Sequence, residues 1–164
     1  MRPFVYSNGY LIFFKKYSNF FKDTIKLDVK LLKNINMEIT LLYASLLSIL
    51  AVFLAYKTGT LRLKTNTLLG AGDSSEMLQS IRAFGNLSEY APLAIIMLGL
   101  LELQDVASWK LHLLGSIFFL CRILHAYGMA ISRESTPYRL VGIVGTWVII
   151  LSMGISGVYL SLPL

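Results

Sequence analysis

Four long apolar stretches follow one another after Met37, and they constrain the fold more than any other feature of the chain. Each is close to the roughly 20 residues that an α-helix needs to cross a lipid bilayer. Short connections between such helices make them antiparallel neighbours. The stretches are residues 39–56, 80–103, 109–131 and 140–162. The sequence therefore predicts an all-α membrane protein, a four-transmembrane-helix bundle with up-down topology.

The composition argues against a soluble four-helix bundle. Of the 164 residues, 55% are hydrophobic and only 15% are charged, which is too apolar for an ordinary soluble domain of this size. A soluble bundle would also keep a polar face on each helix. The last stretch, 140–162, contains no charged residue. We therefore expect one compact membrane domain that contacts the lipid bilayer, with no room for a separate soluble domain.

The first 36 residues differ from the rest of the chain. They hold seven Lys and Arg against two Asp, so they carry +5 of the total net charge of +6. Residues 1–36 lack the uninterrupted apolar core and the cleavage site of a secretory signal. We interpret 1–36 as a basic leader, either a misassigned start or disordered, and 37–164 as the membrane domain. The alternative is a basic amphipathic helix on the membrane surface. Because the basic charge belongs to this leader, no nucleic acid partner is expected.

The basic residues of the membrane domain predict its orientation. Five of them lie on the side of the first and third connections, whereas Lys110 lies on the other side. The positive-inside rule then places those two connections in the cytoplasm and both termini outside. Including the leader would add seven basic residues to the opposite side, so the positive-inside rule would then give conflicting orientations. The five residues are Lys57, Arg62, Lys64, Arg133 and Arg139.

The second apolar stretch carries a polar stripe. Its members are Arg82, Asn86, Glu89 and Tyr90. Offsets of 0, 4, 7 and 8 residues place all four within about 100° of one helical face. A charged residue at the centre of a membrane helix costs roughly 2.5 to 3.5 kcal/mol, so a functional reason is expected.

Two interpretations of this stripe compete. One is a structural ion pair between Arg82 and Glu89, but an offset of 7 is less favourable for a helix pair than 3 or 4. The other is a ligand that meets a cation, an amide, a carboxylate and a phenol along one face. A small zwitterionic peptide fits that set of groups. Pro92 leaves the carbonyl of Ser88 without its usual helical partner and can kink the helix beside the stripe.

The third stretch carries a second polar stripe, with Arg122, His125, Met129 and Arg133 at offsets of 0, 3, 7 and 11. For His125, a hydrogen-bonded structural imidazole and a ligand or catalytic role are equally compatible with the pattern. We expect no metal site, because His112 and His125 are more than three turns apart.

Two further local features predict structure. Asp73 and Ser74 precede a helical pattern, which indicates a loop that ends in a helix cap near Ser75. Glu102 lies at the far end of the second stretch and points away from the Arg82 stripe. We interpret it as an interfacial charge.

The run R82-A-F-G-N86-L-S-E89-Y90-A-P92-L strongly resembles the signature of the MAPEG family, the membrane-associated proteins of eicosanoid and glutathione metabolism. The resemblance extends over 37–164. It implies a homotrimer of four-helix subunits that binds glutathione as co-substrate between neighbouring subunits. The resemblance also implies that glutathione is held by Arg82, Asn86, Glu89 and Tyr90, and we assign Arg122 and His125 of the second stripe to the same site.

The same resemblance implies an activity. In the transferases of the family an arginine stabilises the thiolate of glutathione, which attacks a hydrophobic small molecule. The candidates here are Arg133 and Arg139, which lie near the family position without matching it. The run R122-I-L-H125-A-Y-G is similar to the corresponding run of short bacterial members of the family. This similarity implies that the protein is located in the bacterial inner membrane.

We therefore expect a membrane-bound glutathione-dependent transferase or peroxidase acting on lipophilic electrophiles. The alternative is a non-catalytic MAPEG-like protein that binds lipid or glutathione. A small drug transporter fits less well, because it would need a carboxylate in the middle of the first stretch. Glu38 lies only at the edge of that stretch.

Overall fold

The computed structural model describes residues 36–162. The interpretation of 1–36 as a leader falls, apart from Asn36, outside the described residues. The described part forms four α-helices, each long and apolar enough to cross a membrane. They are α2 (Glu38–Thr65), α3 (Ser75–Leu103), α4 (Ser108–Ile131) and α5 (Pro137–Ser161).

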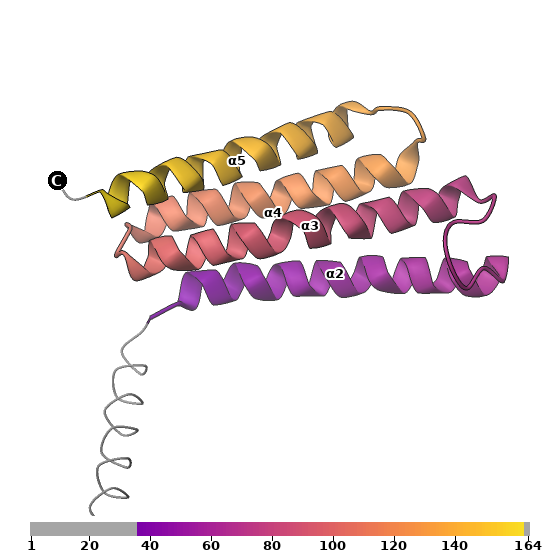
Figure 1. Cartoon of the computed structure of the whole chain (residues 1–164), viewed down its shortest axis with the longest axis horizontal. Coiled ribbons are helices and arrows are strands. Elements are labelled where there is room, and N and C mark those ends of the chain that lie inside the picture. Colours follow the sequence, from indigo (N-terminus) through magenta and orange to yellow (C-terminus); the bar gives the residue numbers. More distant parts are fainter. Residues whose placement is uncertain (1–35, 163–164) are drawn as a thin grey trace, which may run out of the picture. The chain divides into compact units, whose positions relative to one another are not determined.

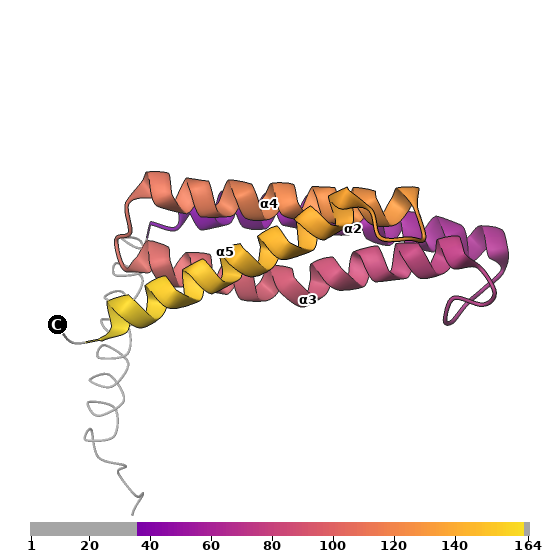
Figure 2. The ribbon, with the colours of Figure 1, turned by 90° about the horizontal axis from the view of Figure 1, so that it is seen from above.

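Consecutive helices run in opposite directions along one long axis (Figure 1). The connection from α2 to α3 and the connection from α4 to α5 therefore lie at the same end of the bundle, which we call the connection end. Figure 2 shows the same bundle turned by 90°, with α5 crossing obliquely over α3 and α4. The predicted four-helix bundle with up-down topology is confirmed.

The first helix is longer than the sequence predicts. The first apolar stretch ends at residue 56, but α2 continues to Thr65. Leu61 is buried, so its packing against the bundle favours one more helical turn. Asn66 then ends the helix in the left-handed conformation, at φ 50°. The side chain of Arg62 donates to three carbonyls of the following segment, those of Thr67, Leu68 and Gly70.

The start of α3 agrees with the sequence. Ser74 is the N-cap, and its hydroxyl accepts a hydrogen bond from the backbone N–H of Met77 at 3.2 Å. At the other connection, Pro137 is the first residue of α5, where its missing N–H costs nothing.

Glycines allow α4 and α5 to approach closely. A Cβ atom added to Gly142 would lie 2.6 Å from the backbone nitrogen of His125 and 2.7 Å from the carbonyl oxygen of Cys121. A Cβ added to Gly128 would lie 2.5 Å from the backbone nitrogen of Arg139. Since these neighbours are backbone atoms, no side-chain movement can make room. This contact fixes where the second polar stripe lies relative to α5.

Glu102 does more than the sequence predicts for an interfacial charge. Its carboxylate accepts hydrogen bonds from the backbone N–H groups of Ile39 at 2.9 Å and Thr40 at 2.8 Å. These are N–H groups of the first turn of α2, which no residue of their own helix can satisfy. The C-terminal end of α3 thus caps the start of α2 across the bundle.

Candidate functional site

The Arg82 and Glu89 side chains lie together on the outer face of α3. They are 54% and 56% exposed, and Arg82 Nη1 lies 3.9 Å from Glu89 Oε1. Both side chains reach along the helix, but at 3.9 Å they make no hydrogen bond with each other, which agrees with the poor reach expected for an offset of 7. Their contact is long and half-exposed, so each group keeps capacity for another partner.

Asn86 and Tyr90 continue the stripe toward α5. Asn86 Nδ2 donates to the carbonyl oxygen of Arg82 at 3.1 Å. The hydroxyl of Tyr90 accepts a hydrogen bond from Trp147 Nε1 at 3.1 Å. Trp147 belongs to α5, so this bond joins one edge of the stripe to the last helix. Sequence reasoning missed Trp147; the signal was a lone indole N–H in an otherwise uncharged stretch.

Arg122 lies beneath the stripe, inside the bundle. Its side chain is only 2% exposed. Nη2 donates to the carbonyl of Gly142 at 3.1 Å, and Nη1 donates to the carbonyl of Asn86 at 3.5 Å. The guanidinium also lies 5.4 Å from the centre of the Tyr90 ring, within cation–π range. Arg122 thus connects α3, α4 and α5, and its guanidinium packs against the Tyr90 ring.

His125 and Met129 are also buried, with 4% exposure each. They lie on the face of α4 that packs inside the bundle, and the backbone of His125 lies against Gly142. The second stripe therefore divides. Its first three members face the interior, whereas Arg133 is exposed in the connection after α4. The prediction that His125 contacts a ligand remains a prediction.

Arg133 follows α4 and Arg139 lies near the start of α5, so both are at the connection end, where α3 begins (Figure 1). Arg139 is half-buried in the first turn of α5. Within residues 36–162, no hydrogen bond or ion pair links either side chain to the stripe. The structure thus brings together Arg82, Asn86, Glu89, Tyr90 and Arg122, whereas the catalytic role predicted for Arg133 and Arg139 remains a prediction.

The depth of the stripe is unusual for exposed charges. Glu89 is the middle residue of the 29-residue helix α3. A helix of that length spans about 43 Å, whereas the hydrocarbon core is about 30 Å thick. Glu89 therefore lies within the membrane-spanning part of α3, where contact with lipid tails is costly. Something other than lipid has to cover this face.

The MAPEG family model matches residues 40–159 of the chain. The chain belongs to the MAPEG family. The match begins in α2 and ends in α5, so it includes all four helices and every residue of the stripe. This confirms the resemblance that the R82-to-L93 run suggested.

Two MAPEG-like relatives are similar over most of their length. Each is called inner membrane protein YecN, one from Escherichia coli K12 and one from Escherichia coli O6:H1. Each is 28% identical over 121 residues, which covers 74% of this chain and 91% of the relative. Together with the four spans, this similarity supports a multi-pass protein of the bacterial inner membrane.

Proposed function

We propose that the chain binds glutathione along the Arg82 stripe and is a membrane-bound glutathione-dependent transferase or peroxidase acting on lipophilic electrophiles. The observation that carries the proposal is the half-exposed pair of Arg82 and Glu89 near the middle of a membrane-spanning helix. A ligand with its own opposite charges is the simplest cover for such a pair.

The chemistry of glutathione fits the groups of the stripe. The tripeptide has two carboxylates and an ammonium group. The guanidinium of Arg82 would hold a carboxylate through paired N–H donors, and the carboxylate of Glu89 would accept from the ammonium. Because the Arg82–Glu89 contact is 3.9 Å long, exchanging it for two contacts with the ligand has a small cost. Asn86 and the phenol of Tyr90 would supply further hydrogen bonds.

A second copy of the chain would close the site. A small peptide cannot cover the whole outer face of α3, which also exposes Leu78, Leu93 and Leu100. Family membership makes a homotrimer the assembly that we propose, with glutathione between neighbouring subunits. A hydrophobic substrate would then arrive through the bilayer.

The non-catalytic alternative rests on a specific observation. Thiol activation needs a cation near the sulfur, yet within the described residues neither Arg133 nor Arg139 forms a hydrogen bond or an ion pair with a side chain of the stripe. A protein that binds glutathione or lipid without activating the thiol is therefore the second candidate.

Ultraviolet absorbance of the bound thiolate, measured against pH, separates the two candidates. A nearby cation lowers a thiol pKa from about 8.5 toward neutrality. For a transferase, we expect thiolate absorbance near pH 7 at saturating glutathione. Arg133→Gln or Arg139→Gln should raise that pKa while leaving glutathione affinity nearly unchanged. Lys64→Gln, an exposed basic residue of α2, is the matched control. A wild-type protein saturated with glutathione but without thiolate at pH 7 would support the binding protein instead.

A further inference from the structure

A cavity of about 420 Å³ lies between α2, α3 and α4, separate from the stripe. Ser80 and Ala83 form part of its wall. Each residue turns the helix by about 100°, so these two positions are about 160° and 100° from Arg82 around α3. The cavity therefore lies on the inner side of α3. Its volume is within the roughly 300 to 1,000 Å³ that small-ligand sites occupy.

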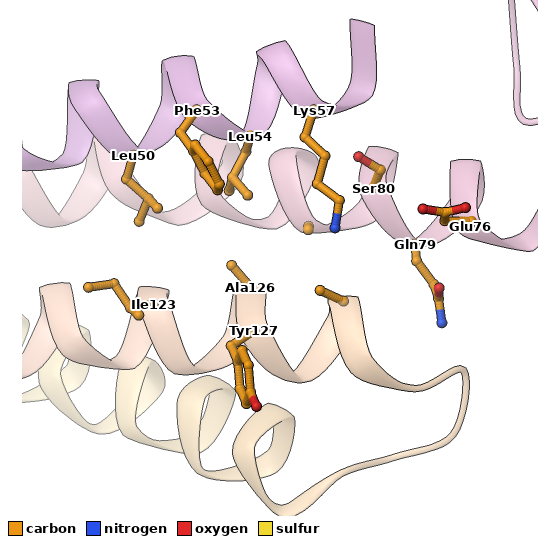
Figure 3. A pocket seen from close by; sticks show the side chains of 12 residues that line it. Leu50, Phe53, Leu54, Lys57, Glu76, Gln79, Ser80, Ile123, Ala126 and Tyr127 are labelled. Atoms are coloured by element: carbon orange, nitrogen blue, oxygen red, sulfur yellow. The ribbon is translucent and has the colours of Figure 1, made fainter. Parts of the chain in front are cut away.

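The cavity has an apolar part and a polar part. Leu50, Phe53 and Ile123 line it toward the middle of the membrane. Toward the connection end, Lys57 projects from α2 while Glu76 and Gln79 project from α3 (Figure 3). Leu50 and Lys57 are seven residues apart, which is about 10 Å along the helix. Such a division suits an amphiphile whose chain lies in the apolar part.

The charges of the polar part follow a definite order along the bundle. Lys57 lies eight residues before the end of α2, about 12 Å from it, whereas Glu76 is the second residue of α3. The cation is therefore deeper and the carboxylate is nearer the connection end (Figure 3). The one ion pair within 4 Å in residues 36–162 is Arg82–Glu89, so Lys57 has no acidic partner at that distance. An ammonium group beside the apolar part of this cavity favours contact with an anion.

We propose that this cavity binds one acyl chain of a phospholipid with a phosphoethanolamine headgroup. In that headgroup the phosphate is next to the acyl chains and the ammonium lies beyond it. The phosphate can therefore pair with Lys57 while the ammonium pairs with Glu76, which is nearer the connection end. A fatty acid or a phosphoglycerol lipid has the anion but no ammonium. Its negative charge would then repel the carboxylate of Glu76. The proposal does not depend on glutathione binding.

Lipid retention tests the proposal. The purified, delipidated protein in detergent is mixed with equal amounts of dioleoyl phosphatidylethanolamine and dioleoyl phosphatidylglycerol. After gel filtration, the lipid retained per chain is measured by mass spectrometry of the extract. The wild type should prefer the ethanolamine lipid by about fivefold, the factor for a charge contact of ~1 kcal/mol.

The variants separate this site from general lipid contact. Glu76→Gln should abolish the preference, and Lys57→Gln should reduce retention of both lipids. Ala126→Leu, which fills the cavity with an apolar side chain, should reduce both without changing a charge. Lys64→Gln and Glu134→Gln, exposed outside the cavity, should behave as wild type. The proposal is overturned if the wild type retains the two lipids equally, or if Glu76→Gln keeps the wild-type preference. It also fails if the wild type retains neither lipid.

Discussion

At the scale of single residues, the site depends on one buried cation. Arg122 donates to the carbonyl of Gly142 and lies against Tyr90, so the backbone of α5 helps to fix the position of the Tyr90 ring. Burial of a guanidinium is tolerated only when hydrogen bonds compensate for lost water. The close approach of α4 and α5 at Gly142 supplies one of those bonds.

Gly142→Ala tests this arrangement. The new Cβ would lie 2.6 Å from a backbone nitrogen and 2.7 Å from a backbone oxygen, so α5 has to move away from α4. We expect a loss of about 1 to 3 kcal/mol in stability, the usual cost of overpacking. Gly154→Ala is the control, since a Cβ there has no neighbour within 4 Å. Thermal unfolding in detergent measures both, and equal melting temperatures would contradict the close packing.

At the scale of helices, the cap that Glu102 provides ties α3 to α2. Glu102→Gln keeps the size of the side chain but removes its charge and one acceptor oxygen. We expect a loss of about 0.5 to 2 kcal/mol, typical of a lost helix cap. Glu38→Gln is the matched control, because Glu38 lies in the first turn of the same helix and is exposed. If both variants unfold at the same temperature, the two hydrogen bonds that Glu102 accepts contribute no more stability than the exposed charge of Glu38.

The local sequence pattern predicted the helices and the shared face, but it could not predict contacts between residues far apart in the chain. Hydrophobic length predicted the four helices, and a period of 3.6 residues predicted that Arg82, Asn86, Glu89 and Tyr90 share a face. The bond from Trp147 to Tyr90 joins residues 57 positions apart, and no local pattern encodes such a pairing. The extra turn of α2 and the Glu102 cap were missed for the same reason, because tertiary packing decides both.

At the scale of the whole molecule, the described part of the chain has two distinct sides around α3. The outer side carries half-exposed charges in a membrane-spanning helix, and the inner side carries the cavity with Lys57. Membrane-spanning helices do not present such charges to lipid without a partner. We propose that a second copy covers the outer side, with glutathione between the copies.

Native mass measurement of the detergent-solubilised protein with added glutathione tests this account most directly, since one spectrum reports both assembly and ligand. We expect a trimer that carries glutathione. Arg82→Ala and Glu89→Ala should remain trimers but bind glutathione about 10- to 150-fold more weakly, which corresponds to roughly 1.5 to 3 kcal/mol for a charge-assisted hydrogen bond. Glu134→Ala, an exposed acid in the α4–α5 connection, should bind as wild type. A monomer that still binds glutathione, or stripe variants that carry as much glutathione as the wild type, would contradict the account.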